Sequence, residues 1–127
     1  MRETMYKDCN NNISFLKSIF LQVQKFSNTE LNWIISNLDY IPVDKGDFVN
    51  GVPCIEMKEL YDFQKKILEE YSINVRHNTL MELFENIKTI YDGVFVALID
   101  GEKFRIKVFD GDIIEIDGEM EDHIIFY

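Results

Sequence analysis

The spacing of apolar residues changes along the chain from a helical period to a strand-like one. From residue 94 onward, short apolar runs are separated by three Asp-Gly pairs, at residues 100–101, 110–111 and 117–118. Asp-Gly is a strong signal for a two-residue hairpin, because type I′ turns need a positive φ at both central positions. Residues 94–127 are therefore predicted to form an antiparallel β-meander of three to four strands.

Before the meander, two segments carry apolar residues at helical spacing. The first runs from Phe15 to Phe26 and follows three asparagines at residues 10–12, whose side chains can cap a first turn. The second spans residues 60–71. Both are predicted to be amphipathic helices with their apolar stripes in the core.

A third helix is predicted to begin at Thr79. Thr79 and Glu82 have the spacing of a capping box, in which each side chain accepts a hydrogen bond from the backbone N–H of the other. An apolar stripe follows through Ile87 and Tyr91, and Gly93 stands where a glycine commonly ends a helix.

Residues 31–38 fit two structures. Their apolar residues match a short helix, which Thr29 is placed to cap, but Leu31, Trp33 and Ile35 also alternate as in a strand. We favour the helix. Trp33 is expected in the core because of its large apolar body.

The fold class that follows is α+β, with three to four helices followed by the C-terminal antiparallel meander packed on them. The chain of 127 residues is expected to be a single domain. Residues 1–9 are expected to fray, and residues 39–55 to form an irregular loop or a small hairpin around Asn50 and Gly51.

Charge narrows the possible partners. The chain has 13 basic and 23 acidic residues, a net charge of −10, and its pI is near 4.5. This balance disfavours nucleic acid and anionic membranes as partners and favours a basic protein. No apolar run approaches the ~20 residues that span a bilayer, and a cytoplasmic location is expected. Cys9 and Cys54 match no metal or redox spacing.

Much of the negative charge lies in residues 110–122, which we call the acidic ribbon. It contains no lysine or arginine and seven carboxylates: Asp110, Asp112, Glu115, Asp117, Glu119, Glu121 and Asp122. Arg105 and Lys107 precede it on a predicted strand and are expected to pair with Asp112 or Glu115 across the sheet. All seven carboxylates are predicted to form the partner-binding site, and those from Asp117 to Asp122, which are expected to stay unpaired, are its strongest candidates.

The acidic ribbon does not match a calcium loop. An EF-hand needs glycine at its sixth position, where this chain has Glu115, and strand alternation would scatter the ligands over two faces. No metal site and no cofactor are predicted.

One short motif points to an enzyme. Asp47 followed by Glu56, Met57 and Lys58 resembles the PD-(D/E)xK nuclease motif, although Gly46 replaces the proline that normally precedes the aspartate. The resemblance implies that the two carboxylates hold Mg²⁺ and that the lysine helps to position the attacking water.

Neither histidine lies in a recognised catalytic motif, and His77 is expected to contact loop backbone. We therefore predict a non-enzymatic acidic protein that neutralises a basic partner, most concretely an immunity or inhibitor protein for a bacterial nuclease-type toxin. The alternatives are the PD-(D/E)xK-like nuclease and an accessory or structural module with no charged partner. The oligomeric state is left open.

Overall fold

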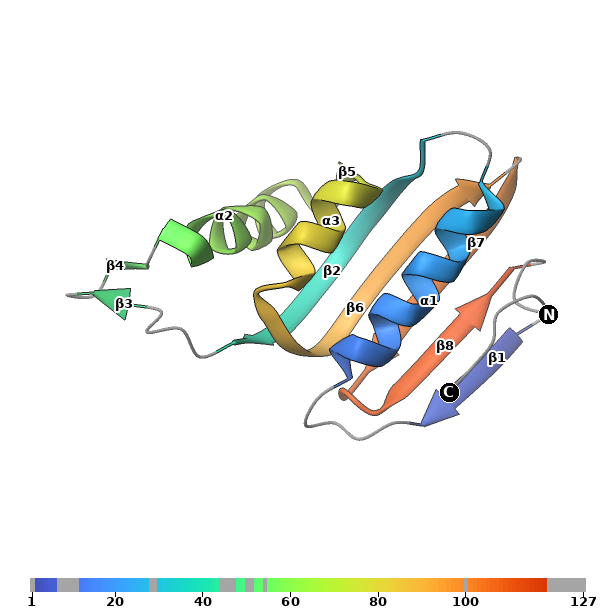
Figure 1. Cartoon of the computed structure of the whole chain (residues 1–127), viewed down its shortest axis with the longest axis horizontal. Helices are drawn as coiled ribbons and strands as arrows, with labels where there is room; N and C mark the ends of the chain where they lie inside the picture. Colours follow the sequence, from blue (N-terminus) through green and yellow to red (C-terminus); the bar gives the residue numbers. More distant parts are fainter. Residues whose placement is uncertain are drawn as a thin grey trace.

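A computed structural model describes residues 2–6, 12–27, 30–43, 48–49, 52–53, 55–99 and 101–118. Its main feature is a six-stranded antiparallel sheet, which α1 and α3 cover on one side while α2 flanks the end formed by β2 and β5 (Figure 1). The strand order is β1-β8-β7-β6-β2-β5, and β3 pairs with β4 in a separate hairpin.

The elements follow one another in this order. They are β1 (Arg2–Tyr6), α1 (Ile13–Phe26), β2 (Asn32–Pro42), β3 (Phe48–Val49), β4 (Val52–Pro53), α2 (Ile55–Glu70), β5 (Ile73–Arg76), α3 (His77–Phe84), β6 (Ile87–Ile99), β7 (Glu102–Phe109) and β8 (Ile113–Asp117). The fold class is α+β, as predicted. The helices, however, alternate with strands instead of all preceding them.

The segment at residues 31–38 is a strand, so our preference for a helix was wrong. In β2, Trp33 and Ile35 are buried while Ile34 between them is 47% exposed. β2 lies between β6 and β5, and both neighbours satisfy its backbone groups. An isolated short helix is marginal in water, and pairing on two sides outweighs the local helical pattern.

The third helix is shorter than predicted and begins earlier. α3 starts at His77 and ends at Phe84, so the predicted capping box at Thr79 does not start the helix. Ile87 and the residues after it belong to β6, and Gly93 lies inside that strand. A Cβ on Gly93 would lie 2.8 Å from the Phe95 ring, so this glycine makes room for an aromatic core residue instead of ending a helix.

The first two predicted turns are present, and one differs in length. A two-residue turn joins Ile99 to its partner Glu102, with Gly101 at φ 81°. At the second, Asp110 and Gly111 both have positive φ, as a type I′ turn requires, and the Asp112 N–H donates to the Phe109 carbonyl. Pairing resumes only at Ile113, so Asp112 is an extra residue between the two strands.

The two ends of the predicted meander differ from expectation. The strand expected after Gly118 falls outside the described residues. On its outer side β8 pairs instead with β1, so residues 2–6, which we expected to fray, form a strand at the edge of the sheet. Within residues 39–55, β3 pairs with β4, as in the small hairpin expected there, whereas residues 39–42, expected in the same irregular region, belong to β2.

The core lies between the sheet and the helices and centres on Phe20 of α1. The Phe20 ring centroid lies 4.5 Å from that of Trp33, 5.2 Å from Phe84 and 5.3 Å from Phe95, so α1, α3, β2 and β6 meet at one aromatic cluster. The apolar stripe predicted for α1 is confirmed, since Leu16, Ile19, Phe20 and Val23 are fully buried. No described helix is both long and apolar enough to cross a bilayer.

Asn12 joins the start of α1 to the sheet. It occupies the N-cap position, but its side chain makes no capping hydrogen bond. Its Nδ2 donates to the carbonyls of Ile90 (2.7 Å) and Gly111 (2.8 Å), and its Oδ1 accepts from the Ile90 N–H (3.0 Å). This buried amide therefore fixes α1 against β6 and against the turn that precedes β8.

Asn12→Ala is expected to lower the free energy of unfolding by about 3 kcal/mol, because it leaves buried backbone groups without partners. Urea denaturation measures the change. Asn32→Ala, at an exposed position of β2, is the control and is expected to stay within about 0.5 kcal/mol of the parent protein. Equal effects of the two substitutions would contradict the anchoring role of Asn12.

Candidate functional site

Two of the four described carboxylates of the acidic ribbon, Glu115 and Asp117, lie beside one guanidinium in the sheet. The Arg105 Nη2 lies 3.5 Å from a carboxylate oxygen of Glu115 and 3.5 Å from one of Asp117. Glu115 is buried at 7% exposure. Asp117, which we expected to be unpaired, therefore lies beside a guanidinium, because the register places it directly across from Arg105.

The other carboxylates of the acidic ribbon do not join this pair. Asp110 is exposed at the turn, and Asp112 follows it as the extra residue. Glu119, Glu121 and Asp122 lie outside the described residues. Lys107 stands across from Glu115, but its Nζ lies over the Phe109 ring, 4.4 Å from the centroid.

The nuclease-like triplet lies in a helix. Residues 56–58 belong to the first turn of α2. Asp47, the first carboxylate of the motif, lies outside the described residues. The triplet therefore does not lie in a strand.

The described residues also contain no group of three or more His, Cys, Asp or Glu side chains placed to hold a metal ion. Cys9 and Cys54 lie outside this part of the chain.

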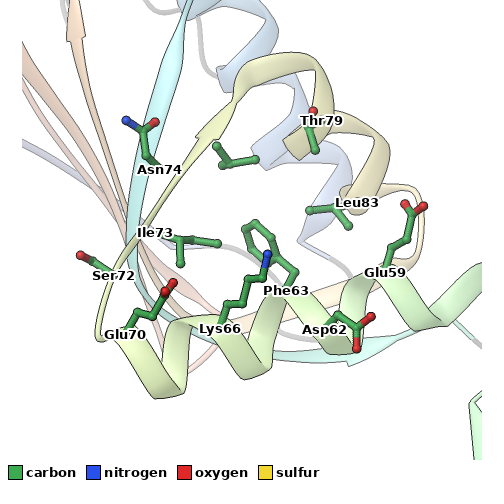
Figure 2. A pocket seen from close by; sticks show the side chains of 11 residues that line it. Glu59, Asp62, Phe63, Lys66, Glu70, Ser72, Ile73, Asn74, Thr79 and Leu83 are labelled. Atoms are coloured by element: carbon green, nitrogen blue, oxygen red, sulfur yellow. The ribbon is translucent and has the colours of Figure 1, made fainter.

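An open cleft of about 730 Å³ lies between α2, β5 and α3. Its floor is apolar: Figure 2 shows Phe63 of α2, Ile73 of β5 and Leu83 of α3 pointing into it. Phe63 and Leu83 are buried, and Ile73 is partly buried against the core. We call this cavity the α2–β5 cleft.

The rim of the α2–β5 cleft is acidic. It carries the carboxylates of Glu59, Asp62 and Glu70 and the ammonium group of Lys66, which leaves a formal charge of −2. All four residues lie on α2 at spacings of three or four, so they form one stripe along the helix beside the buried stripe of Leu60, Phe63 and Ile67.

Sequence reasoning missed this site because the five carboxylates of α2 are interspersed with three lysines and form no continuous acidic run. The signal present in the sequence is the spacing of residues 59, 62, 66 and 70, which places charged groups on one edge of the apolar face. A cleft with an apolar floor and a carboxylate rim can accept an apolar side chain together with lysine or arginine.

His77 and Trp33 form a buried polar pair next to the core. The Trp33 Nε1–H donates to His77 Nδ1 at 3.0 Å, so His77 is the neutral tautomer that carries its proton on Nε2. His77 Nε2 is buried and has no partner among the described residues. The expected backbone contact also exists, since the His77 N–H donates to the Leu31 carbonyl.

Burial lowers the pKa of His77 below its usual value, because the charged imidazolium is poorly solvated there. A cavity of about 340 Å³ adjoins His77 and is lined by Glu30, Gln24 and Asn78 among others. Protonation of Nδ1 would also remove the acceptor of the Trp33 hydrogen bond.

Comparison with protein-family models, with curated proteins and with solved structures gave no match.

The free energy of unfolding is expected to fall as the pH drops below about 6.5, the unfolded pKa of histidine. Because the pKa of His77 is lower in the folded state, the unfolded state binds more protons in this pH range. The stabilisation that results is fully present above the unfolded pKa and is lost as the pH falls toward the folded pKa of His77. His77→Asn keeps an acceptor for Trp33 and removes the titration. Urea denaturation from pH 7.5 to 5.5 should give a flatter pH profile for the variant, and identical profiles would contradict this role.

Arg105→Gln is expected to lower the free energy of unfolding by about 1–2 kcal/mol, because it removes the cation beside buried Glu115 and half-exposed Asp117. Lys103→Gln, at an exposed position two residues away on β7, is the matched control and should change stability by less than about 0.5 kcal/mol. If both variants unfold at the same urea concentration, the pairing contributes nothing to stability.

Proposed function

We propose that the protein is a non-enzymatic acidic binding protein that neutralises a basic protein partner. In its most concrete form, it is an immunity or inhibitor protein for a bacterial nuclease-type toxin. The observation that carries this proposal is the α2–β5 cleft, in which an apolar floor is bordered by Glu59, Asp62 and Glu70. The cleft belongs to a chain with a net charge of −10.

Charge and shape support the proposal together. A basic partner would be drawn to the protein by its overall negative field, which mainly raises the rate of association. The cleft then offers an apolar floor that the partner would desolvate on binding, and buried contacts of this kind supply most of the affinity of an interface. Carboxylates on the rim would occupy lysine and arginine side chains that a nuclease uses to bind phosphates.

The cleft also changes the expected position of the interface. In the acidic ribbon, Arg105 stands beside two of the four described carboxylates, Glu115 and Asp117. On the rim of the cleft, Lys66 is the sole basic residue among the described lining residues. We therefore place the partner at the cleft and keep the acidic ribbon as the competing site.

A second candidate function, an accessory or structural module, is supported by the sheet face opposite the helices. Ile34 of β2 and Val96 of β6 are cross-strand neighbours on this face, and Leu98 is 69% exposed two residues further along β6. Exposed apolar residues that adjoin on a sheet are typical of a protein–protein contact. This candidate expects association through these residues and no dependence on charge.

Two variants that remove the same charge separate the two acidic sites. The cleft variant combines Glu59→Gln, Asp62→Asn and Glu70→Gln, and the ribbon variant combines Glu119→Gln, Glu121→Gln and Asp122→Asn. The parent protein, tagged and expressed in its source cells, is expected to co-purify with a basic protein. The cleft variant should associate with it at least about tenfold more slowly, whereas the ribbon variant should be affected less.

The other outcomes are equally informative. A larger effect of the ribbon variant would place the interface on the acidic ribbon. A captured partner that is not basic, or whose binding does not weaken as salt is raised, would overturn the proposed function. Self-association of the parent protein in sedimentation velocity, abolished by Leu98→Asp, would favour the accessory module.

A further inference from the structure

One strand of the sheet lies at its edge beside the α2–β5 cleft. β5 is the last strand in the order, and within the described residues it pairs only with β2. Ser72, Asn74 and Arg76 are all exposed. An edge strand of this kind carries backbone N–H and C=O groups that can pair with another chain.

The direction of the backbone groups follows from one hydrogen bond. The N–H of His77 donates to the carbonyl of Leu31 on the β2 side, at 2.9 Å. Backbone groups alternate in direction along a strand, so the groups of Ile73 and Val75 also face β2, in agreement with their register. The N–H groups of Asn74 and Arg76 and the carbonyl of Asn74 therefore face away from β2, toward the free edge.

The side chains of β5 link this edge to the cleft. Ile73 and Val75 line the cleft with apolar side chains; Asn74 also borders the cleft, but its side chain points to the other side of the strand in Figure 2. A segment added alongside β5 would follow the same alternation, with every second side chain directed toward the cleft. Those side chains would meet Phe63 and Leu83 on the floor and the carboxylates of α2 on the rim.

We propose that the free edge of β5 captures an extended basic segment of the protein partner, which adds to the sheet as a further strand. Backbone hydrogen bonds to Asn74 and Arg76 hold the segment, an apolar side chain fills the cleft, and lysine or arginine side chains lie among Glu59, Asp62 and Glu70. This mode rests on the proposed function and specifies how the partner binds.

Charge selects this occupant over a second copy of the chain. Pairing of β5 with the β5 of another copy would bring two acidic clefts together, each part of a chain with a net charge of −10. Repulsion between like charges opposes that arrangement, whereas a basic segment is attracted by the same groups. Strand addition supplies the affinity through the backbone, and the cleft supplies the selectivity.

The test uses a capped synthetic peptide with the repeat Val-Thr-Lys-Thr, which places valine and lysine on one face of the added strand, and a matched peptide that has glutamate in place of lysine. Amide hydrogen exchange of the parent protein is measured by NMR with and without peptide. The amides of Asn74 and Arg76 should exchange rapidly in the free protein and at least about tenfold more slowly with the lysine peptide bound. The amides of Ile73 and Val75, which face β2, are the internal control. The glutamate peptide should have no effect.

N-methylation of the peptide tests the backbone bonds without altering the protein. One peptide is methylated at the valine and lysine nitrogens and another at the threonine nitrogens, so each has lost its donors along one edge. Strand addition predicts that only the peptide methylated on the edge facing β5 loses affinity, by about tenfold or more. The protein variant Asn74→Pro, which removes a donor at an edge position that tolerates proline, should weaken the unmethylated peptide similarly.

Several results would overturn the inference. Equal affinity of the two methylated peptides, or binding of the lysine peptide with unchanged exchange at Asn74 and Arg76, would exclude strand addition. If these amides already exchange slowly without peptide, and their exchange slows further as the protein concentration rises, a second copy of the chain is the occupant. If Asn74→Pro leaves binding of the native partner intact while the cleft variant weakens it, the proposed function stands and the edge mode fails.

Discussion

The pairing of β2 with strands on both sides is the constraint on which most of the molecule depends. β2 joins β6 through one edge and β5 through the other, and without it β5 would have no place in the sheet. It also carries Trp33, which packs on Phe20 of α1 and donates its only hydrogen bond to His77 at the start of α3. One strand thus positions both the aromatic core and the polar pair at the helix start. The α2–β5 cleft exists because β2 holds β5 at the end of the sheet, where α2 and α3 approach it.

Asn12 fixes the N-terminal end of α1 to the sheet. Its amide satisfies backbone groups of β6 and of the turn between β7 and β8. This buried amide and the Trp33–His77 pair are polar features inside an otherwise apolar core. Each has specific partners, and such groups favour one arrangement of helices on the sheet over others of similar apolar burial.

The distribution of negative charge has two parts with different physical roles. In the sheet, carboxylates of the acidic ribbon lie across from a basic strand, and the guanidinium of Arg105 offsets the cost of burying Glu115. On α2, the carboxylates line an open cleft where water and a partner can reach them. The net charge of the chain includes both groups of carboxylates equally, although those of the cleft are more accessible to a partner than those beside Arg105. The free edge of β5 lies beside these carboxylates, so backbone hydrogen-bonding groups and negative charge are available at the same place.

The sequence by itself determined the elements whose signals are local. The apolar stripes of α1 and α2, the Asp-Gly turns of the β-meander and the α+β class all follow from periods and turn chemistry that act within a few residues. Tertiary structure decided the remainder. Residues 31–38 became a strand, and Ile87 to Gly93 joined β6 instead of extending a helix, because distant strands satisfy their backbone groups. The tertiary structure also decided the pairing of Asp117 with Arg105 and the formation of the α2–β5 cleft. Arg105 and β5 reach these neighbours only once the sheet has formed. Local patterns encode which face of an element is apolar, but they do not encode which element will cover that face.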